Sequence, residues 1–468
     1  MINGDVSHND VQVMAQVFFH HLPFAVVDEM PENGLCLLVE KDAAGMITAR
    51  LYDAGLLLCE FFAPPPKADE KEVLPVAVAI YSVLAEFTGY RPPWGLLTGI
   101  RPAKLFTQAY SLGRGRNEAI DEIMTRYLVE ESRANLCADV AATQGRIMAT
   151  SPENALSIYV GVAFCPTICN YCSFSAYPIT KFGKRENAYI EALIKEVEHL
   201  AKISKDMFVE NIYIGGGTPT SLNDENFERL LGTIAENFDT QKALEYTVEA
   251  GRPDTITPAK LRIMREKHVG RISINPQTLN DETLQRIGRN HSVADFFEAY
   301  KLALEHGFEH INVDLILGLE GEGRADVERS LTGIVALEPK SVTIHSLAVK
   351  RASKLHADVV TSGAYGVAAQ ADMLQLCAEY MGQAGLAPYY LYRQKNSPGN
   401  FENVGYAKIG HEGRYNIHMM EETRSVYAAG CGAITKLVDA ESGRIERVVN
   451  LRDLDQYIAR GGRLWEVQ

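Results

Sequence analysis

The chain has 468 residues, of which 46% are hydrophobic and 23% charged, and its formal net charge is −14. This length exceeds what a single compact core usually supports and predicts two or three domains. The acidic balance argues against nucleic acid and anionic membranes as bulk partners, so an anionic substrate would need a local basic pocket.

The beginning of the chain shows no targeting feature. MINGDVSHND has neither a basic n-region nor an apolar h-region, which predicts that no signal peptide is present. The apolar run from Val73 to Phe87 contains Pro75 and is too short to span a bilayer, so we expect a buried helix and no integral membrane segment. Five scattered cysteines favour reduced thiols in a cytoplasmic protein over a disulfide framework: Cys36, Cys59, Cys137, Cys377 and Cys431.

Residues 1–150 are expected to form an α+β domain whose role the sequence does not define. Short β-rich runs such as LCLLVEK come first, the loop APPPKADEKE follows, and helical stretches continue to Met148. The segment Pro93 to Phe106 carries Arg101 and Lys104 between glycines and prolines. We interpret it as a tight turn leading into a helix, in preference to a ligand-binding loop.

The sequence pattern is different in residues 151–350, where β-rich runs alternate with amphipathic stretches. The runs are SIYVGVAF, NIYIGGG, EYTVEA, RISINPQ, HINVDLILGL and SVTIHSL. This alternation predicts an α/β fold with a parallel sheet, and six repeats indicate a partial (β/α)6 barrel with ligands at the carboxyl ends of its strands. Residues 351–468 are loop-rich and are expected to cover one side of the barrel mouth.

Three cysteines lie within eight residues directly after the first predicted barrel strand. Cys165, Cys169 and Cys172 have the spacing Cys-x3-Cys-x2-Cys, and no second Cys or His pair follows that would complete a usual structural zinc site. Three thiolates can instead hold three irons of a [4Fe–4S] cluster and leave the fourth open for a small ligand. Zinc or coincidental thiols remain alternatives at this point.

Polar or glycine-rich groups end three of the following strands, and a fourth strand carries an acidic residue within it. YIGGGTPTSL ends the second strand, Glu249 the third and Gln277 the fourth, while Asp314 lies within the fifth. Individually these are compatible with a turn, a helix cap or a polar strand end. Together they favour a site for an aminoacyl group and ribose hydroxyls.

With these features, the chain resembles the radical S-adenosylmethionine (SAM) enzymes, and more narrowly the oxygen-independent coproporphyrinogen III oxidase (dehydrogenase) family with its haem-chaperone relatives. The resemblance is strong from Ser157 to Leu347 and weaker to Lys436. The amino-terminal WGLLTGIRPAKL and the later GNFENVGYAK resemble the coproporphyrinogen dehydrogenase branch that carries an extra N-terminal domain.

The resemblance implies site residues position by position. Cys165, Cys169 and Cys172 would hold the cluster, and Tyr159 would be the catalytic residue that packs on the cluster and a first SAM. Contacts to that SAM would come from Gly216, Glu249 and Ile434. A second SAM site is implied by these residues: Tyr171, Gly217, Thr218, Gln277, Arg289, Asp314 and Ala348.

The implied reaction is the oxidative decarboxylation of two coproporphyrinogen III propionates to vinyl groups, giving protoporphyrinogen IX in haem biosynthesis. The implied partners are the porphyrinogen and a low-potential electron donor such as a flavodoxin or ferredoxin. Arg351, Arg393 and Lys395 are candidates for contacts with the substrate carboxylates.

Departures from the family pattern keep two alternatives open. Phe174 replaces a fourth cysteine and Gly161 replaces a histidine, which puts the later steps of the decarboxylation in doubt. A haem chaperone is one alternative, although its His-Asn-Phe-Tyr segment appears here as YNIH, from Tyr415 to His418. A radical SAM enzyme acting on another substrate is the second.

Overall fold

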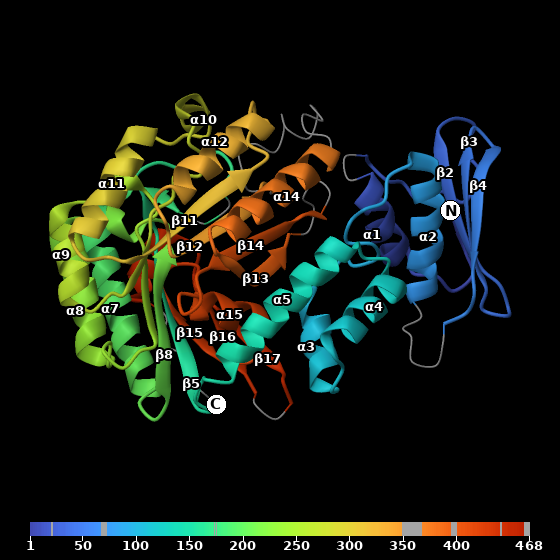
Figure 1. The fold of residues 1–468 in the computed structure, drawn as a ribbon. Coiled ribbons are helices and arrows are strands. Elements are labelled where there is room, and N and C mark those ends of the chain that lie inside the picture. Colours follow the sequence, from blue (N-terminus) through green and yellow to red (C-terminus); the bar gives the residue numbers. More distant parts are fainter. Residues whose placement is uncertain are drawn as a thin grey trace. The chain divides into compact units, whose positions relative to one another are not determined.

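The computed structural model describes residues 1–19, 22–66, 73–172, 174, 176–348, 367–394, 400–439 and 442–462 (Figure 1). It contains two compact units. Unit 1 comprises Met1–Asp139 and Tyr392–Glu402, and unit 2 comprises Val140–Leu391 and Asn403–Gln468. No helix among the described residues combines the length and apolar character needed to cross a bilayer.

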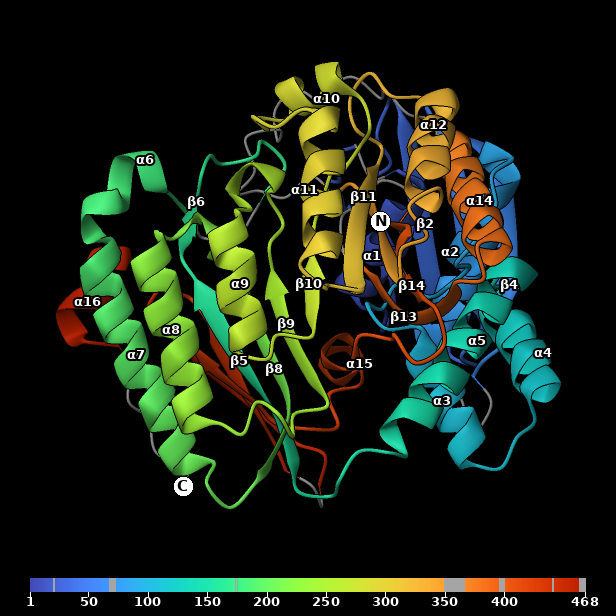
Figure 2. The same ribbon diagram turned by 60° about the vertical axis from the view of Figure 1, so that its left-hand side comes forward.

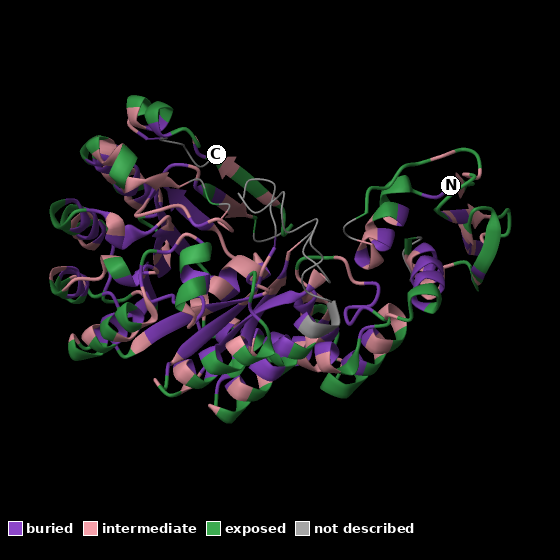
Figure 3. Cartoon of the chain, turned by 90° about the horizontal axis from the view of Figure 1, so that it is seen from above, coloured by how far each residue is buried: buried purple, intermediate pink, exposed green. Residues whose placement is uncertain are grey.

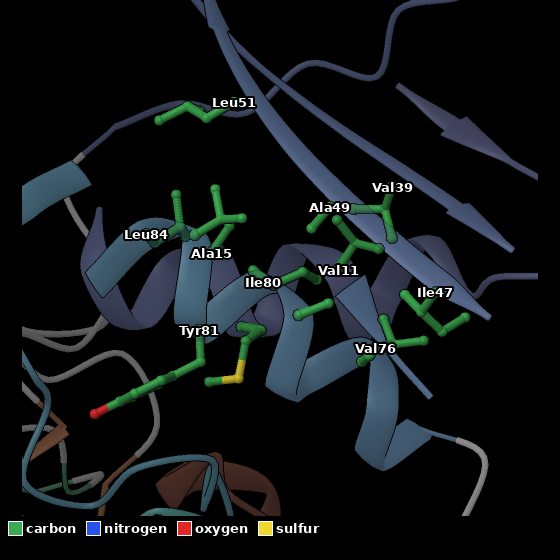
Figure 4. Packing of buried hydrophobic residues seen from close by; sticks show 14 of the residues in the cluster. Val11, Ala15, Val39, Ile47, Ala49, Leu51, Val76, Ile80, Tyr81 and Leu84 are labelled. Atoms are coloured by element: carbon green, nitrogen blue, oxygen red, sulfur yellow. The ribbon is translucent and has the colours of Figure 1, made fainter. Parts of the chain in front are cut away.

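Unit 1 is built on a four-stranded sheet in the order β1 (Ile2–Asn3), β2 (Leu35–Lys41), β3 (Ile47–Asp53) and β4 (Leu56–Ala63). The strands β2, β3 and β4 are antiparallel neighbours. Helices α1 (His8–Phe18) and α2 (Val73–Thr88) pack on the sheet through a core of Val11, Ala15, Ile47 and Ile80, among others (Figure 4). The apolar run of α2 is therefore a buried helix, as expected.

Three more helices, α3 (Ala103–Ser111), α4 (Arg116–Tyr127) and α5 (Glu131–Met148), follow the turn-rich segment after Pro93. Trp94 is fully buried there and donates its Nε1–H to Glu402 over 2.8 Å. Arg133 contacts the same carboxylate at 2.9 Å, and the guanidinium of Arg393 lies 4.9 Å from the centre of the Trp94 ring. The segment Tyr392–Glu402 is thus anchored in unit 1 by a buried charged cluster.

Unit 2 contains the six predicted barrel strands in the predicted order. They are β5 (Ala155–Val162), β8 (Phe208–Gly216), β9 (Glu245–Glu249), β10 (Arg271–Ser273), β11 (His310–Leu317) and β12 (Ser341–Ser346), and neighbours pair in parallel. The sheet is open, because its ends are the separate strands β13 (Ala387–Arg393) and β17 (Ile445–Val449).

The region after residue 366 extends both ends of this sheet. On one side, β14 (Glu402–Ala407) pairs antiparallel with β12. On the other, β15 (Val426–Ala429) pairs in parallel with β5, and β16 (Ile434–Val438) and β17 continue as an antiparallel hairpin. The region also contains α14 (Val367–Gln383), α15 (Arg414–Glu421) and α16 (Leu454–Arg460).

Helices follow the barrel strands and cover one face of the sheet (Figure 2). They are α7 (Glu186–Ile203), α8 (Asp224–Asn237), α9 (Pro258–Glu266), α10 (Asp281–Arg286), α11 (Val293–Glu305) and α12 (Arg324–Val335). Asn223, Thr257, Asn280 and Ser292 cap the amino termini of α8 to α11 with their side chains. Between the sheet and these helices lies a dry core, drawn in purple in Figure 3, with the exposed residues on the outer helix faces.

The other face of the barrel sheet is polar, because strand residues alternate in direction. Apolar Val248, Ile272 and Val313 are fully buried. Their neighbours in sequence are polar or charged side chains, and some of these contact one another, as Asn312 and Asp314 do. This alternation gives the barrel interior the groups from which a polar site can be built.

Candidate active site at the carboxyl ends of the barrel strands

The cysteine loop lies at the carboxyl end of β5. The short strand β6 (Phe164–Cys165) pairs with β7 (Tyr177–Pro178), which leads into α6 (Ile179–Phe182). Thr167 donates its hydroxyl to the Gly288 carbonyl at 2.9 Å, and the Asn170 amide donates to Ile287 at 3.0 Å. The loop is therefore held by the turn that follows α10.

The glycines that end β8 allow this loop to approach closely. A Cβ atom on Gly217 would lie 2.4 Å from the Phe164 carbonyl oxygen and 3.0 Å from the Cys165 Sγ. Gly216 has φ +100°, a conformation that favours glycine. The Thr218 amide donates to the Phe164 oxygen at 2.7 Å, and its hydroxyl lies 3.4 Å from Cys165 Sγ.

All three cysteines are free thiols, and Cys165 and Cys172 are partly exposed. Burial raises the pKa of the Cys165 thiol to about 11, and the neighbouring cysteines add to this rise. Arg252, which is paired with Asp254, acts in the opposite direction and lies 4.0 Å from the Cys169 Sγ through Nη1. Cluster or metal binding would therefore release protons from this loop.

The donor set fits a cluster better than a single ion. Within the described residues, no group of three or more His, Cys, Asp or Glu side chains surrounds one possible metal position. A [4Fe–4S] cluster does not require such convergence, because each thiolate binds a different iron. The short loop, the close glycine contacts and the nearby guanidinium fit a cluster held by three thiolates.

A stack of tyrosines stands inside the barrel. The rings of Tyr159 and Tyr213, which are register partners on β5 and β8, are 6.3 Å apart. Tyr415 from α15 stacks on Tyr213 at 4.2 Å. The Tyr213 hydroxyl donates to the Glu249 carboxylate at 2.5 Å. Sequence reasoning found Tyr159 and Glu249 but missed the other two tyrosines.

Glu249 is the acidic group with the clearest perturbation. Burial raises its pKa to about 7, Asp314 adds to the rise, and the hydrogen bond from Tyr213 and the charge of Arg271 oppose it. A carboxyl group with such a pKa can be protonated or ionised near neutrality. Its charge is therefore set by what binds beside it.

A second group of polar residues is joined through Arg289. Its Nη1 donates to the Asn275 carbonyl at 2.7 Å and the Gly251 carbonyl at 3.0 Å, and its Nη2 donates to the Tyr171 hydroxyl at 3.1 Å. The Asn275 side chain in turn donates to Asp314 at 2.8 Å. Asn275 was not among the predicted residues, although it lies two positions before Gln277 and alternation in a strand would have indicated it.

Gln277 occupies an unusual backbone position next to this group. It has φ +71°, and its backbone N–H donates to the backbone carbonyl of Asp314 at 3.0 Å. Its buried Oε1 has no hydrogen-bond partner among the described residues, and neither does the buried Nε of Arg289. Unpaired buried polar atoms are costly, so these two atoms indicate where a polar ligand would be stabilised.

Comparison with known proteins places these features in a family. The model of the radical SAM superfamily matches residues 159–332. The chain is 36% identical to the oxygen-independent coproporphyrinogen-III oxidase-like protein HemZ of Bacillus subtilis, over 98% of this chain and 94% of HemZ. The chain belongs to this coproporphyrinogen oxidase-like family of radical SAM proteins. The family implies a [4Fe–4S] cluster and SAM as cofactors.

Two further comparisons show the range of the family. The chain is 31% identical to the haem chaperone HemW of Bacillus subtilis, over 56% of this chain and 66% of HemW. The solved structure of the coproporphyrinogen III oxidase HemN from Escherichia coli has a TM-score of 0.54 and 23% identity, and it covers 69% of this chain and 74% of HemN. This likeness confirms the predicted radical SAM fold.

Two of the positions that the family pattern suggested lie outside the six barrel strands. Ala348 follows β12 and is 8% exposed, whereas Ile434 begins β16 and is 38% exposed. Because β15 lies between β16 and β5, Ile434 is one strand removed from Tyr159. Phe174 stands where the family pattern has a fourth cysteine, and its side chain is exposed and does not pack into the interior.

Gly161 is closely packed by its neighbours. A Cβ on Gly161 would lie 3.2 Å from the Tyr159 ring, and one on Gly430 would lie 2.2 Å from the Gly161 oxygen. The same oxygen accepts a hydrogen bond from Tyr189 at 2.5 Å. A side chain at position 161 would therefore require the Tyr159 ring to shift by a few tenths of an ångström.

The structure corrects the prediction that Arg393 contacts substrate carboxylates. Arg393 is 3% exposed, covers the Trp94 ring in unit 1, and donates to the backbone carbonyls of Leu97 and Asn400. The Arg393 guanidinium therefore binds groups of unit 1. The other two candidates, Arg351 and Lys395, lie outside the described residues.

Proposed function

We propose that this protein is an oxygen-independent coproporphyrinogen III oxidase that converts two propionates of its substrate to vinyl groups, giving protoporphyrinogen IX. The observation that carries the proposal is the Arg289 group, which extends through Tyr171, Asn275 and Asp314 and leaves Gln277 Oε1 unpaired. Such a group is suited to an aminoacyl or ribose ligand beside the cysteine loop.

In this proposal Cys165, Cys169 and Cys172 hold the cluster and Tyr159 packs beside it. When bound, the cluster and SAM supply a 5′-deoxyadenosyl radical by reductive cleavage of the sulfonium. Glu249 and Gly216 would bind the first SAM, and Ile434 and Ala348 would contribute only apolar contacts. The Arg289 group, with Gly217 and Thr218, would hold a second SAM.

The chain's own residues would keep water away and orient the reacting carbon. Tyr415 is buried and Tyr159 and Tyr213 are half-buried in the barrel interior, and their stacked rings would help to exclude water from the site. Each propionate would lose one hydrogen atom to the radical, then CO2 and one electron, and an external one-electron acceptor would take up that electron. A low-potential flavodoxin or ferredoxin in the cytoplasm is the proposed electron donor for SAM cleavage.

The test is an anaerobic assay of iron-reconstituted protein with SAM, a strong reductant and coproporphyrinogen III. We expect protoporphyrinogen IX and 5′-deoxyadenosine to appear together, with two deoxyadenosines for two vinyl groups. Arg289→Lys should lower vinyl formation more than Arg262→Lys, a change on the exposed face of α9. Deoxyadenosine without any decarboxylated porphyrin would refute the proposed substrate and leave a radical SAM enzyme of another specificity.

A haem-delivery role is a second candidate, favoured by the 31% identity to HemW. Two residues in the segment corresponding to the haem-binding motif count against it. Tyr415 is stacked in the barrel, and His418 is 1% exposed with its Nε2 3.2 Å from the buried Glu210. Haem titration followed by absorbance tests this role: tight binding that is lost in His418→Ala, without turnover, would replace the oxidase proposal.

A further inference from the structure

A cavity of about 710 Å³ lies at the end of the barrel where its parallel strands begin, opposite to the cysteine loop. Its lining includes Glu245, Arg271 and His310, the first residues of β9, β10 and β11. Glu412 and Arg414, at the beginning of α15, line another side. The volume is within the range of small-molecule sites. We call it the floor cavity.

The acidic groups of the floor cavity already have hydrogen-bond donors. Glu412 accepts hydrogen bonds from Arg146 and from the Gly410 amide. Glu245 accepts from the Arg414 amide at 2.5 Å, and so caps the amino terminus of α15. The guanidinium of Arg414 is paired with Glu210, which is fully buried. These carboxylates and Arg414 are therefore engaged within the protein.

Arg271 differs from Arg414, because its donors are not all used. It is 3% exposed, and its Nε donates to His310 Nε2 at 3.2 Å. Its buried Nη2 has no acceptor among the described residues. Burial and the charge of Arg271 lower the pKa of His310 to about 2, so His310 is a neutral acceptor and brings no compensating charge. The Glu245 carboxylate acts on Arg271 as a nearby negative charge, but one guanidinium donor of Arg271 still lacks an acceptor among the described residues.

A second buried donor lines the same cavity. The Tyr246 side chain is 3% exposed, and its hydroxyl has no partner among the described residues. Apolar surface is supplied by Ile147 and Leu244, the latter 50% exposed at the rim. An unpaired buried donor costs free energy, and two of them beside one cavity indicate a missing acceptor.

We propose that the floor cavity binds a small organic anion, whose carboxylate or phosphate group pairs with Arg271 and whose apolar body lies against Ile147 and Leu244. This site is separate from the SAM and porphyrinogen sites, since it opens at the opposite end of the same strands. The pairing would give the Arg271 Nη2 the hydrogen-bond acceptor that it lacks. Arg271 also acts on Glu249, so occupation of the floor cavity would alter the charge at the other end of the barrel.

Isothermal titration calorimetry of the full chain with phenyl phosphate and with benzoate tests the proposal. Benzyl alcohol serves as the uncharged analogue. We expect one equivalent of at least one anion to bind, benzyl alcohol not to bind, and SAM not to compete. The tighter of the two anions identifies a phosphate or a carboxylate ligand.

Variants separate the floor cavity from other anion sites. Arg271→Gln should weaken binding at least about tenfold, the loss expected for a charge-assisted hydrogen bond, and Arg262→Gln on the exposed face of α9 should not. If Arg271→Gln does not fold, Tyr246→Phe and Leu244→Asp are informative, because the first removes one hydroxyl and the second adds a negative charge at the exposed rim. Absence of binding by both anions, or binding that none of these changes weakens, would overturn the proposal.

Discussion

Replacing Glu249 by glutamine should change how the stability of the metal-free protein depends on pH. The carboxyl group has a pKa of about 7 in the folded chain, against an ordinary value of 4.5. The folded state therefore holds this proton more tightly than the unfolded state, and stability falls as pH rises from about 4.5 through 7. The whole difference corresponds to at most about 3 kcal/mol.

Most of that loss is accessible to experiment. Between about pH 5.5 and pH 8 the carboxyl should lower the free energy of unfolding by about 2 kcal/mol, and less if solvent reaches the group. Urea unfolding of wild type and Glu249→Gln at several pH values gives the difference directly. Since glutamine keeps the shape and cannot ionise, the variant should lose this part of the slope.

The matched control is Glu266→Gln, which removes an exposed carboxylate from α9 in the same unit. The free energy of unfolding of this variant should depend on pH in the same way as that of the wild type. Identical slopes in wild type and Glu249→Gln, or a wild type whose relative stability increases toward pH 8, would refute the account of Glu249 as a carboxyl group destabilised by burial.

Three further predictions follow from single contacts. Gly217→Ala should lower the free energy of unfolding by about 1–3 kcal/mol and reduce iron incorporation, because the added Cβ would meet the Phe164 oxygen at 2.4 Å. Gly232→Ala within α8 has open space around the added Cβ and should raise the free energy of unfolding by up to about 1 kcal/mol. Urea unfolding and iron analysis of both variants check this prediction, and equal behaviour of the two would contradict it. Cys165→Ser should lose most of the bound iron and the absorbance near 400 nm, measured after anaerobic reconstitution, while Cys36→Ser on β2 should keep both; retention of iron by Cys165→Ser would exclude this thiol as a ligand. Trp94→Phe should destabilise unit 1 by about 1–3 kcal/mol, because Glu402 loses a buried donor, and the sensitivity of the chain to limited proteolysis should increase; an unchanged digestion pattern would show that the Trp94–Glu402 bond contributes little.

Much of the fold was predictable from the sequence, because it is encoded locally. Strands such as β8 and β11 are rich in apolar residues, and helices α8 to α11 begin with side-chain caps, so both elements and order were predicted correctly. The cysteine loop could be recognised for the same reason, since its three thiols lie within eight residues. The glycines after β8 marked the place where that loop approaches the sheet.

The parts that sequence reasoning missed depend on contacts between distant residues. Tyr415 lies in the barrel on a helix, α15, whose amino terminus is capped by Glu245 from far earlier in the chain. Arg393 has the sequence context of a solvated charge, yet Trp94 and two backbone carbonyls bury it. No local pattern predicts such partners, because the energy of each contact depends on a residue whose position is fixed by the completed fold.

The pairing of β15 with β5 has a consequence for how the protein is made. Val426 is the register partner of Ser157, so the first strand of the barrel finds its outer neighbour only when most of the chain has left the ribosome. Until then the outer edge of β5 has no strand from this sheet beside it, and an apolar strand with an open edge is a site at which chains associate. Synthesis of this protein should therefore depend on chaperones that protect the nascent chain, and truncations before residue 426 should aggregate even though they retain every cysteine of the loop.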